Sequence, residues 1–221
     1  MEPLNQNIEG LRTHALLVGM FLLEPKISAE ASRWRSWLVH CLLKAARHYN
    51  EARDLILAQI AEGERSTAEM MKGRLLPILD FALAMEDCIT SLDKVVVCIN
   101  ELEKKGAMSG GRVMVLEAER TTLKRLRNQQ EHMHVQVAAG QTGEGPIYVT
   151  VADDDEGMRF RDLSMTFSAL HRLIDAAYRD IAMLLPGHDT NSPPCQAGRP
   201  TLSMSAIVTE HQPGKPPRRV L

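Results

Sequence analysis

Residues 77–100 read PILDFALAMEDCITSLDKVVVCIN, and apolar side chains recur along this stretch at alternating spacings of three and four. This spacing places the apolar side chains on one face of an α-helix. The positions on that face are Ile78, Ala82, Met85, Ile89, Leu92, Val96 and Ile99. A capping box at Ser66 and Glu69 predicts that this helix begins there, and that Pro77 kinks its early turns.

The same helical spacing continues over most of the first 185 residues. We expect four further helices, at about 8–22, 32–62, 112–138 and 163–184, the first of them ending before Pro25. Two β-rich segments, IYVTV (147–151) and MRFR (158–161), flank the acidic turn ADDDEG and predict a hairpin. The sequence therefore predicts an all-α fold, an antiparallel bundle of about five helices with a small β-hairpin (about 147–161) inserted before the last helix.

The chain of 221 residues, 44% of them hydrophobic, is long enough for one main domain, which we place at residues 1–185. Residues 186–221 are rich in proline and have no helical period, which predicts a disordered tail. The formal net charge of −2 gives no overall basic signal. Any contact with nucleic acid must therefore come from a local patch.

The cysteines and the N-terminal residues indicate in which cellular compartment the protein is expected. The four cysteines are far apart and form no C-x-x-C pair, which favours reduced, buried thiols over a disulfide framework or a zinc site. The apolar run ALLVGMFLL (15–23) is too short to span a membrane, and the residues before it lack the positive charge of a signal peptide. We expect a cytoplasmic protein without a membrane span.

A polar cluster, LRNQQEHMH (126–134), lies within the helix expected at 112–138. At 100° per residue, Arg127, Asn128, Glu131 and His132 form one arc opposite the apolar stripe, and Arg120 and Lys124 extend it. The apolar stripe consists of Leu116, Leu123, Leu126, Met133 and Val137. This arc is either a solvated helix face, tied by an Arg127–Glu131 pair, or a face buried against a second protomer.

Residues 127–132, RNQQEH, resemble the R-x4-H motif of HEPN (higher eukaryotes and prokaryotes nucleotide-binding) domains, in which a polar residue commonly follows the arginine, as Asn128 does. The resemblance covers this motif and the helical setting of residues 1–185. It implies a metal-independent endoribonuclease that acts on RNA as a homodimer, without a cofactor, as a toxin or defence effector. A second R-x4-H match, Arg35 to His40, lies in a helix that is apolar almost all round, and we expect a core or stacking role for Arg35.

The resemblance suggests a role for each residue of the cluster. His132 would act as general base or acid in attack of the RNA 2'-hydroxyl on phosphorus. Arg127 would hold the scissile phosphate and stabilise its added charge, and Asn128 would orient the imidazole or bind a phosphate oxygen. Glu131 would pair with Arg127 or balance its charge. The cations Arg120 and Lys124 would contact the RNA.

Two further points keep alternatives open. One branch of the family continues the motif as R-x4-H-x-Y and is regulated by a nucleotidyltransferase antitoxin that modifies the tyrosine. Position 134 here is His134, so this modification is not implied, although an antitoxin or other regulator stays open. The alternative function is a non-catalytic HEPN-like binding or regulatory module. DDDE (153–156) is expected to be a solvated turn, so no metal site is predicted.

Overall fold

The computed structural model describes residues 1–20, 27–71, 73, 77–142, 146–152, 156–185, 188, 209–210 and 218–219. Its helices are α1 (Ile8–Met20), α2 (Ala29–Gly63), α3 (Thr67–Met70), α4 (Ile78–Lys104), the 3-10 helix η1 (Val113–Val115), α5 (Glu117–Glu131), α6 (Met133–Ala138) and α7 (Phe167–Met183). Its strands are β1 (Thr150–Val151), β2 (Gly157–Phe160), β3 (Leu163–Thr166), β4 (Thr209–Glu210) and β5 (Arg218–Arg219). The predicted helical bundle with a β insertion before the last helix is confirmed.

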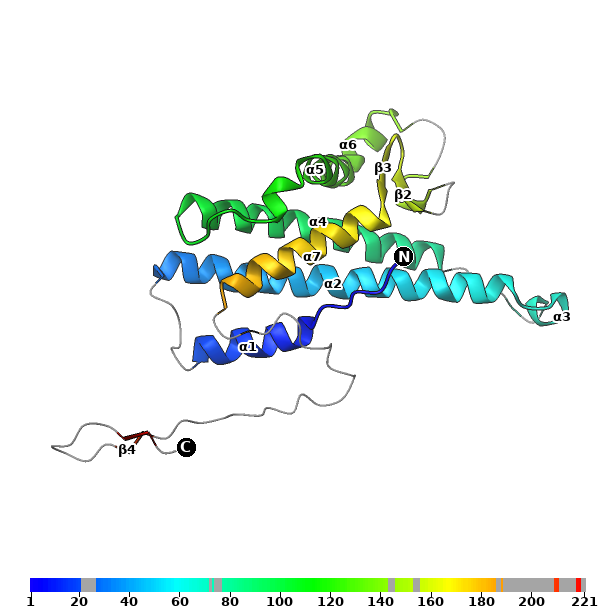
Figure 1. The fold of residues 1–221 in the computed structure, drawn as a ribbon. Helices are drawn as coiled ribbons and strands as arrows, with labels where there is room; N and C mark the ends of the chain where they lie inside the picture. Colours follow the sequence, from blue (N-terminus) through cyan, green and yellow to red (C-terminus); the bar gives the residue numbers. More distant parts are fainter. Residues whose placement is uncertain are drawn as a thin grey trace.

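The centre of the fold is the antiparallel pair α2 and α4 (Figure 1). Their direction follows from two ion pairs, Glu30 with Lys105 at one end and Lys44 with Asp87 further along. Figure 1 shows α1 on one side of α2, and α4 and α5 on the other. The facing side chains are fully buried: Leu38, Leu42, Ala45 and Tyr49 of α2, and Met85, Ile89, Leu92 and Ile99 of α4. Each large apolar side chain buried in this way contributes about 1.5–3 kcal/mol, so this interface anchors the bundle.

The expected continuous helix from Ser66 through Pro77 is wrong. The capping box does form, but it opens the four-residue helix α3, and α4 begins immediately after Pro77. Proline lacks a backbone N–H and is tolerated at a helix start, where that donor has no intrahelical partner. Pro77 therefore starts a helix here, whereas the sequence interpretation placed a kink at this position.

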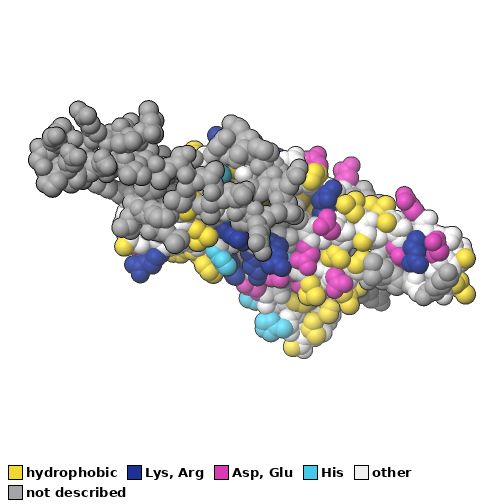
Figure 2. Space-filling view, turned by 90° about the horizontal axis from the view of Figure 1, so that it is seen from below, with side chains coloured by type: hydrophobic (Ala, Val, Ile, Leu, Met, Phe, Trp, Pro, Cys, Tyr) yellow, Lys and Arg dark blue, Asp and Glu magenta, His cyan; other side chains and the backbone are white. Residues whose placement is uncertain are grey.

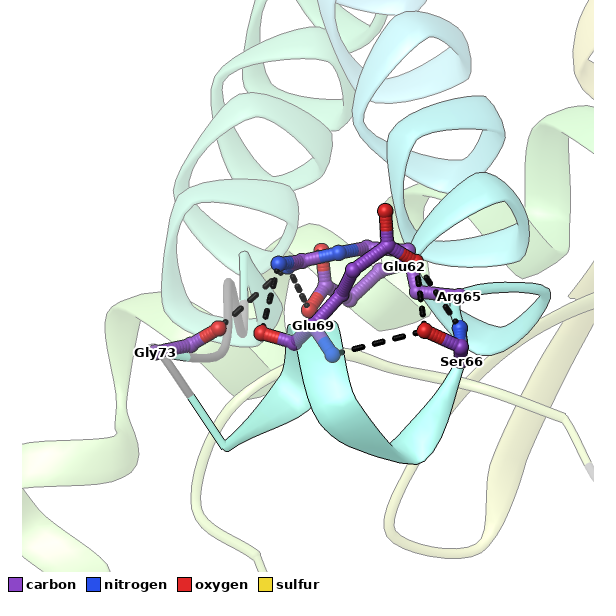
Figure 3. A network of polar contacts seen from close by, with 5 residues as sticks. All are labelled: Glu62, Arg65, Ser66, Glu69 and Gly73. Atoms are coloured by element: carbon purple, nitrogen blue, oxygen red, sulfur yellow. Dashed lines mark hydrogen bonds and ion pairs between the residues drawn. The ribbon is translucent and has the colours of Figure 1, made fainter.

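A polar network joins the end of α2 to α3 (Figure 3). Arg65 Nη1 donates to both carboxylate oxygens of Glu62, at 2.6 and 2.8 Å, and to the carbonyl of Gly73 at 3.3 Å. Arg65 Nη2 donates to the carbonyl of Glu69 at 2.9 Å. Glu62 is buried, so its charge depends on this pairing.

The β insertion is a three-stranded antiparallel sheet in the order β1-β2-β3. The predicted hairpin is β1 with β2, while β3 occupies residues that the sequence interpretation gave to the start of the last helix. A two-residue turn joins β2 to β3, and Arg161 in it has φ 57°, as hairpin turns of this length require. Helix α7 starts only after Thr166, whose hydroxyl accepts from the N–H of Ala169.

The helix expected at 112–138 is divided into three. Asp180 of α7 accepts hydrogen bonds from the N–H groups of Arg112 (2.7 Å) and Val113 (3.0 Å), which fixes η1 before α5 begins. The chain then breaks at His132, between α5 and α6. The expected single helix at 112–138 is therefore wrong, and the break at His132 changes the geometry of the candidate site.

Some expectations fall outside the described residues: the end of the first helix near Pro25, acidic residues 153–155, Cys195, and the tail after Leu185 except His188 and the antiparallel pair of β4 and β5. Within the described part of the chain, no helix is long and apolar enough to cross a membrane. Figure 2 shows dark-blue and magenta side chains interspersed on the uncovered part of one face, so neither sign of charge dominates there.

Candidate functional site

The guanidinium of Arg127 is the centre of a polar cluster between α5 and α4. Its Nε lies 3.7 Å from Asp93 Oδ2 of α4, and its Nη2 lies 2.7 Å from Glu131 Oε1. Its Nη1 donates to Asn128 Oδ1 at 3.1 Å. All three nitrogens therefore have a partner, and Arg127 is only 33% exposed. The helical projection predicts that Arg127 lies on the outer arc. In the structure Arg127 lies at the edge of α5 and its guanidinium contacts Asp93 of α4.

Helix α5 presents this edge because Leu123 and Leu126 on its inner face are fully buried. These two leucines fix the rotation of α5 against the bundle, with contacts to α4, α7 and β3. Gln129 Nε2 also donates to Asp162 Oδ1 at 3.2 Å, in the turn before β3. The position of Arg127 is thus set by packing on one side and by a polar contact to the sheet on the other.

Asp93 is a member of the cluster that the sequence interpretation missed. Its side chain is 13% exposed, and burial raises its pKa, although the charges of Arg127 and Lys124 act in the opposite direction. Burial prevails because the Arg127 guanidinium is 3.7 Å away and is partly committed to Glu131. The position of Asp93 directly after Leu92, beside the predicted apolar stripe, is the signal that could have indicated a carboxylate near the core.

His132 lies at the junction of α5 and α6, and its side chain is exposed. Its N–H donates to the Asn128 carbonyl at 3.1 Å, and its own carbonyl accepts from Val135 (3.0 Å) and Gln136 (3.2 Å). These backbone bonds hold the residue at the break. Among the described residues, no hydrogen bond or ion pair involves the imidazole. The Asn128 side chain contacts Arg127, where the sequence interpretation had it orienting the imidazole or binding phosphate.

The two cations assigned to RNA contact occupy different settings. Lys124 is exposed, and its charge acts on Asp93, so it belongs to the same neighbourhood as Arg127. Arg120 Nη1 instead contacts Met114 Sδ at 3.2 Å, in η1, and its buried Nε has no hydrogen-bond partner among the described residues. The structure brings together Arg127, Asn128, Glu131 and Lys124 with Asp93, and it engages Arg120 elsewhere.

The second R-x4-H match has a different setting. Arg35 is buried, with only 4% of its surface exposed, as its expected core role requires. His40 is exposed and stacks on Trp37, with ring centroids 5.1 Å apart and an interplanar angle of 18°. Arg35 is thus inside the bundle and His40 is at its surface, so the two side chains do not form one accessible site.

Helix α6 exposes apolar surface beside His132. Val135 and Val137 are half exposed, although the sequence interpretation placed Val137 in the buried stripe. That placement is wrong because the break at His132 restarts the helix and changes its rotation. Met133 stays partly buried against the core, and His134 is exposed. Arg161 from the β2–β3 turn donates to Gln136 and holds α6 from the other side.

The remaining reactive groups lie in the core. Cys41, Cys88 and Cys98 are free and buried, in agreement with their expected packing role, and burial raises the pKa of Cys88 to about 12. Within the described residues, no group of three or more His, Cys, Asp or Glu side chains is placed to hold a metal ion.

Comparisons of the chain with protein-family models, with curated proteins and with solved structures give no significant match.

Proposed function

We propose that this chain is a metal-independent endoribonuclease of HEPN type, which cleaves RNA at a composite site between two copies of the chain. The observation that carries the proposal is the pairing, near the C-terminal end of α5, of a positioned guanidinium at Arg127 with an exposed imidazole five residues later at His132, where the helix ends. Arginine and histidine are the side chains suited to binding a phosphodiester and to transferring a proton near neutral pH.

In this proposal His132 takes the proton of the RNA 2'-hydroxyl. The 2' oxygen then bonds to phosphorus, the bond from phosphorus to the 5' oxygen breaks, and a second histidine from the other copy protonates that leaving oxygen. Arg127 neutralises the added negative charge on the phosphoryl oxygens. The products are a 2',3'-cyclic phosphate and a 5'-hydroxyl, and the reaction uses no metal or cofactor.

RNA must displace part of the existing cluster to reach Arg127. Glu131 is the easier partner to displace, because its side chain is 45% exposed and a solvated ion pair contributes only about 0.2–1 kcal/mol. Asp93 is better shielded and would keep its contact with Nε, leaving the two terminal nitrogens for a phosphate. Asp93 is then a positioning residue, Lys124 adds a cation beside the phosphate, and Arg120 has no direct role.

The proposed homodimer is supported by the exposed apolar side chains of Val135 and Val137 on α6, next to His132. Burying them against a second copy would cover this surface and bring two His132 residues toward one cleft. The role as a cytoplasmic toxin or defence effector, with or without a regulator that restrains it, belongs to the same proposal.

A second candidate function is a non-catalytic HEPN-like binding or regulatory module. It is favoured by the engagement of all three Arg127 nitrogens within the chain, which accounts for Arg127, Asn128 and Glu131 as a structural link between α5 and α4. In that case the motif residues stabilise the bundle and do not transfer protons.

RNA cleavage in the presence of EDTA at neutral pH distinguishes the two candidates. The endoribonuclease proposal expects Arg127→Ala and His132→Ala each to abolish cleavage. The matched controls Arg125→Ala and His134→Ala remove an exposed arginine of α5 and an exposed histidine of α6, and should cleave at the wild-type rate. If the wild-type protein leaves RNA intact, or the motif variants cleave as well as the controls, the proposal fails.

A further inference from the structure

Both tryptophans of the chain line one shallow hollow near the start of α2. The hollow has a volume of about 580 Å³ and is lined by Glu30, Arg33, Trp34 and Trp37. Trp37 is 48% exposed, in a protein whose aromatic content is only 4%. Leaving half of an indole in water forgoes about 2–3 kcal/mol of burial energy, so folding alone does not explain its position.

The exposed indole is part of a larger flat surface. His40, one turn later on α2, stacks on Trp37 with its ring nearly parallel, at a centroid distance of 5.1 Å and an angle of 18°. Both rings are at the surface. A planar aromatic surface of this kind offers a stacking partner to another flat ring, because every nucleobase has a π-face.

Cations stand on both sides of this platform. Lys105 of the α4 C-terminus bonds Glu30 at 2.7 Å, and Lys44 bonds Asp87 at 3.2 Å, so two bridges between α2 and α4 bracket Trp37 along the helix. Arg33, four residues before Trp37 and on its face, donates from Nε to the Ala29 carbonyl at 3.3 Å, and its charge helps to lower the pKa of Glu30. Among the described residues its terminal guanidinium nitrogens have no hydrogen bond or ion pair.

We propose that this hollow is a binding site for single-stranded nucleic acid, in which one base stacks on the Trp37–His40 platform and an adjacent phosphate contacts Arg33. A flat aromatic surface with a cation at its edge matches the alternation of bases and phosphates along a strand. A protein partner fits less well, because the rim is charged and the hollow is shallow. The site is separate from the α5 cluster, and the inference does not depend on RNA cleavage.

Tryptophan fluorescence tests the site directly, because no tryptophan lies outside the hollow. The full chain carrying His132→Ala, which prevents turnover of the ligand, is titrated at low salt with short oligouridylate, oligoadenylate, the matching DNA strands and the free nucleotides. We expect both kinds of strand to quench the fluorescence and to bind more tightly than free nucleotides. A preference for RNA over DNA would assign the ligand to RNA.

Substitutions separate stacking from charge. Measured with labelled strands, Trp37→Ala should weaken binding about 5- to 150-fold, as the loss of one stacked base does, and Trp37→Phe should weaken it less. Arg33→Gln should reduce the slope of log affinity against log salt by about 0.7. Leu57→Ala is the matched control, because Leu57 is a large apolar residue of the same helix with 46% exposure.

The inference is overturned if no strand quenches the fluorescence, or if Trp37→Ala binds strands as tightly as Leu57→Ala does. It is also overturned if Trp37→Ala changes the sedimentation of the protein while strand binding is unaltered, which would make the hollow a protein interface. Strand binding that depends on Trp37 in a protein that cleaves no RNA would refute the endoribonuclease proposal and leave this site standing.

Discussion

The contact between Asp180 and η1 gives the most quantitative test of the fold. Asp180 is fully buried, and its two carboxylate oxygens accept from the N–H groups of Arg112 and Val113. A hydrogen bond to a charged group contributes about 1.5–3 kcal/mol, so Asp180→Ala removes about 3–6 kcal/mol of interaction. Burial raises the pKa of Asp180, which shows that the buried charge has a cost that the alanine variant no longer carries. The net loss in the free energy of unfolding should be about 2–4 kcal/mol.

The variant Asp180→Asn keeps the size and shape of the side chain but removes its charge, so it tests the contribution of the charge separately. An amide keeps one acceptor oxygen and turns a donor toward the second N–H, so it should also destabilise the protein, with a different dependence on pH. Because the pKa of Asp180 is raised in the folded state, protonation of the carboxyl favours folding. The contribution is fully present below the unfolded-state pKa and is lost as pH rises through the folded-state pKa.

Urea unfolding followed by circular dichroism measures both effects. The stability advantage of the wild type over Asp180→Asn should shrink as pH rises above about 4. A loss below about 1 kcal/mol in Asp180→Ala, or an advantage over Asp180→Asn that grows with pH, would contradict the reasoning.

Three other changes test separate parts of the structure. Arg65→Ala removes the hydrogen bonds that connect α3 to α2, so amide hydrogen exchange in residues 62–71 should become faster. The exchange of buried α4 amides should stay unchanged, and equal acceleration in both regions would refute a local role for Arg65. Thr166→Ala removes the N-terminal cap of α7 and should lower the free energy of unfolding by about 1 kcal/mol, whereas Thr166→Ser should restore most of it in the same urea titration. Asp substituted for both Val135 and Val137 should convert a dimer to monomers in sedimentation analysis, with the exposed Leu57→Asp as control; unchanged sedimentation would exclude α6 as the interface.

The regular parts of the fold could be predicted from the sequence because they depend on local spacing. Most of the predicted stripe is buried as expected, from Ala82 to Ile99, with Val96 partly buried, since each turn of an amphipathic helix repeats the same relation to the core. Ile78, the first position of the stripe, is exposed because it is the first residue of α4. The hairpin of β1 and β2 was also predicted from alternation around a turn. Strand β3 was missed because Leu163 begins a spacing that continues into α7, and only the pairing with β2 shows where the strand ends.

The candidate site was predicted only in part, because its geometry depends on contacts that are distant in sequence. The Arg127–Glu131 pair follows from spacing along one helix and is present at 2.7 Å. The contact with Asp93 joins two helices, and the position of Asp93 beside Leu92 indicates only that its carboxylate lies near the core, without identifying Arg127 as its partner. The break at His132 was also unforeseen, since no proline or glycine marks it, and it exposes Val137 that a continuous helix would bury.

The most direct test of the proposed function is end-group analysis of RNA incubated with the protein in EDTA. We expect fragments with 2',3'-cyclic phosphate and 5'-hydroxyl ends from the wild type and from His134→Ala, and no fragments from His132→Ala. Intact RNA with the wild type, or the same fragments from His132→Ala, would refute the endoribonuclease proposal.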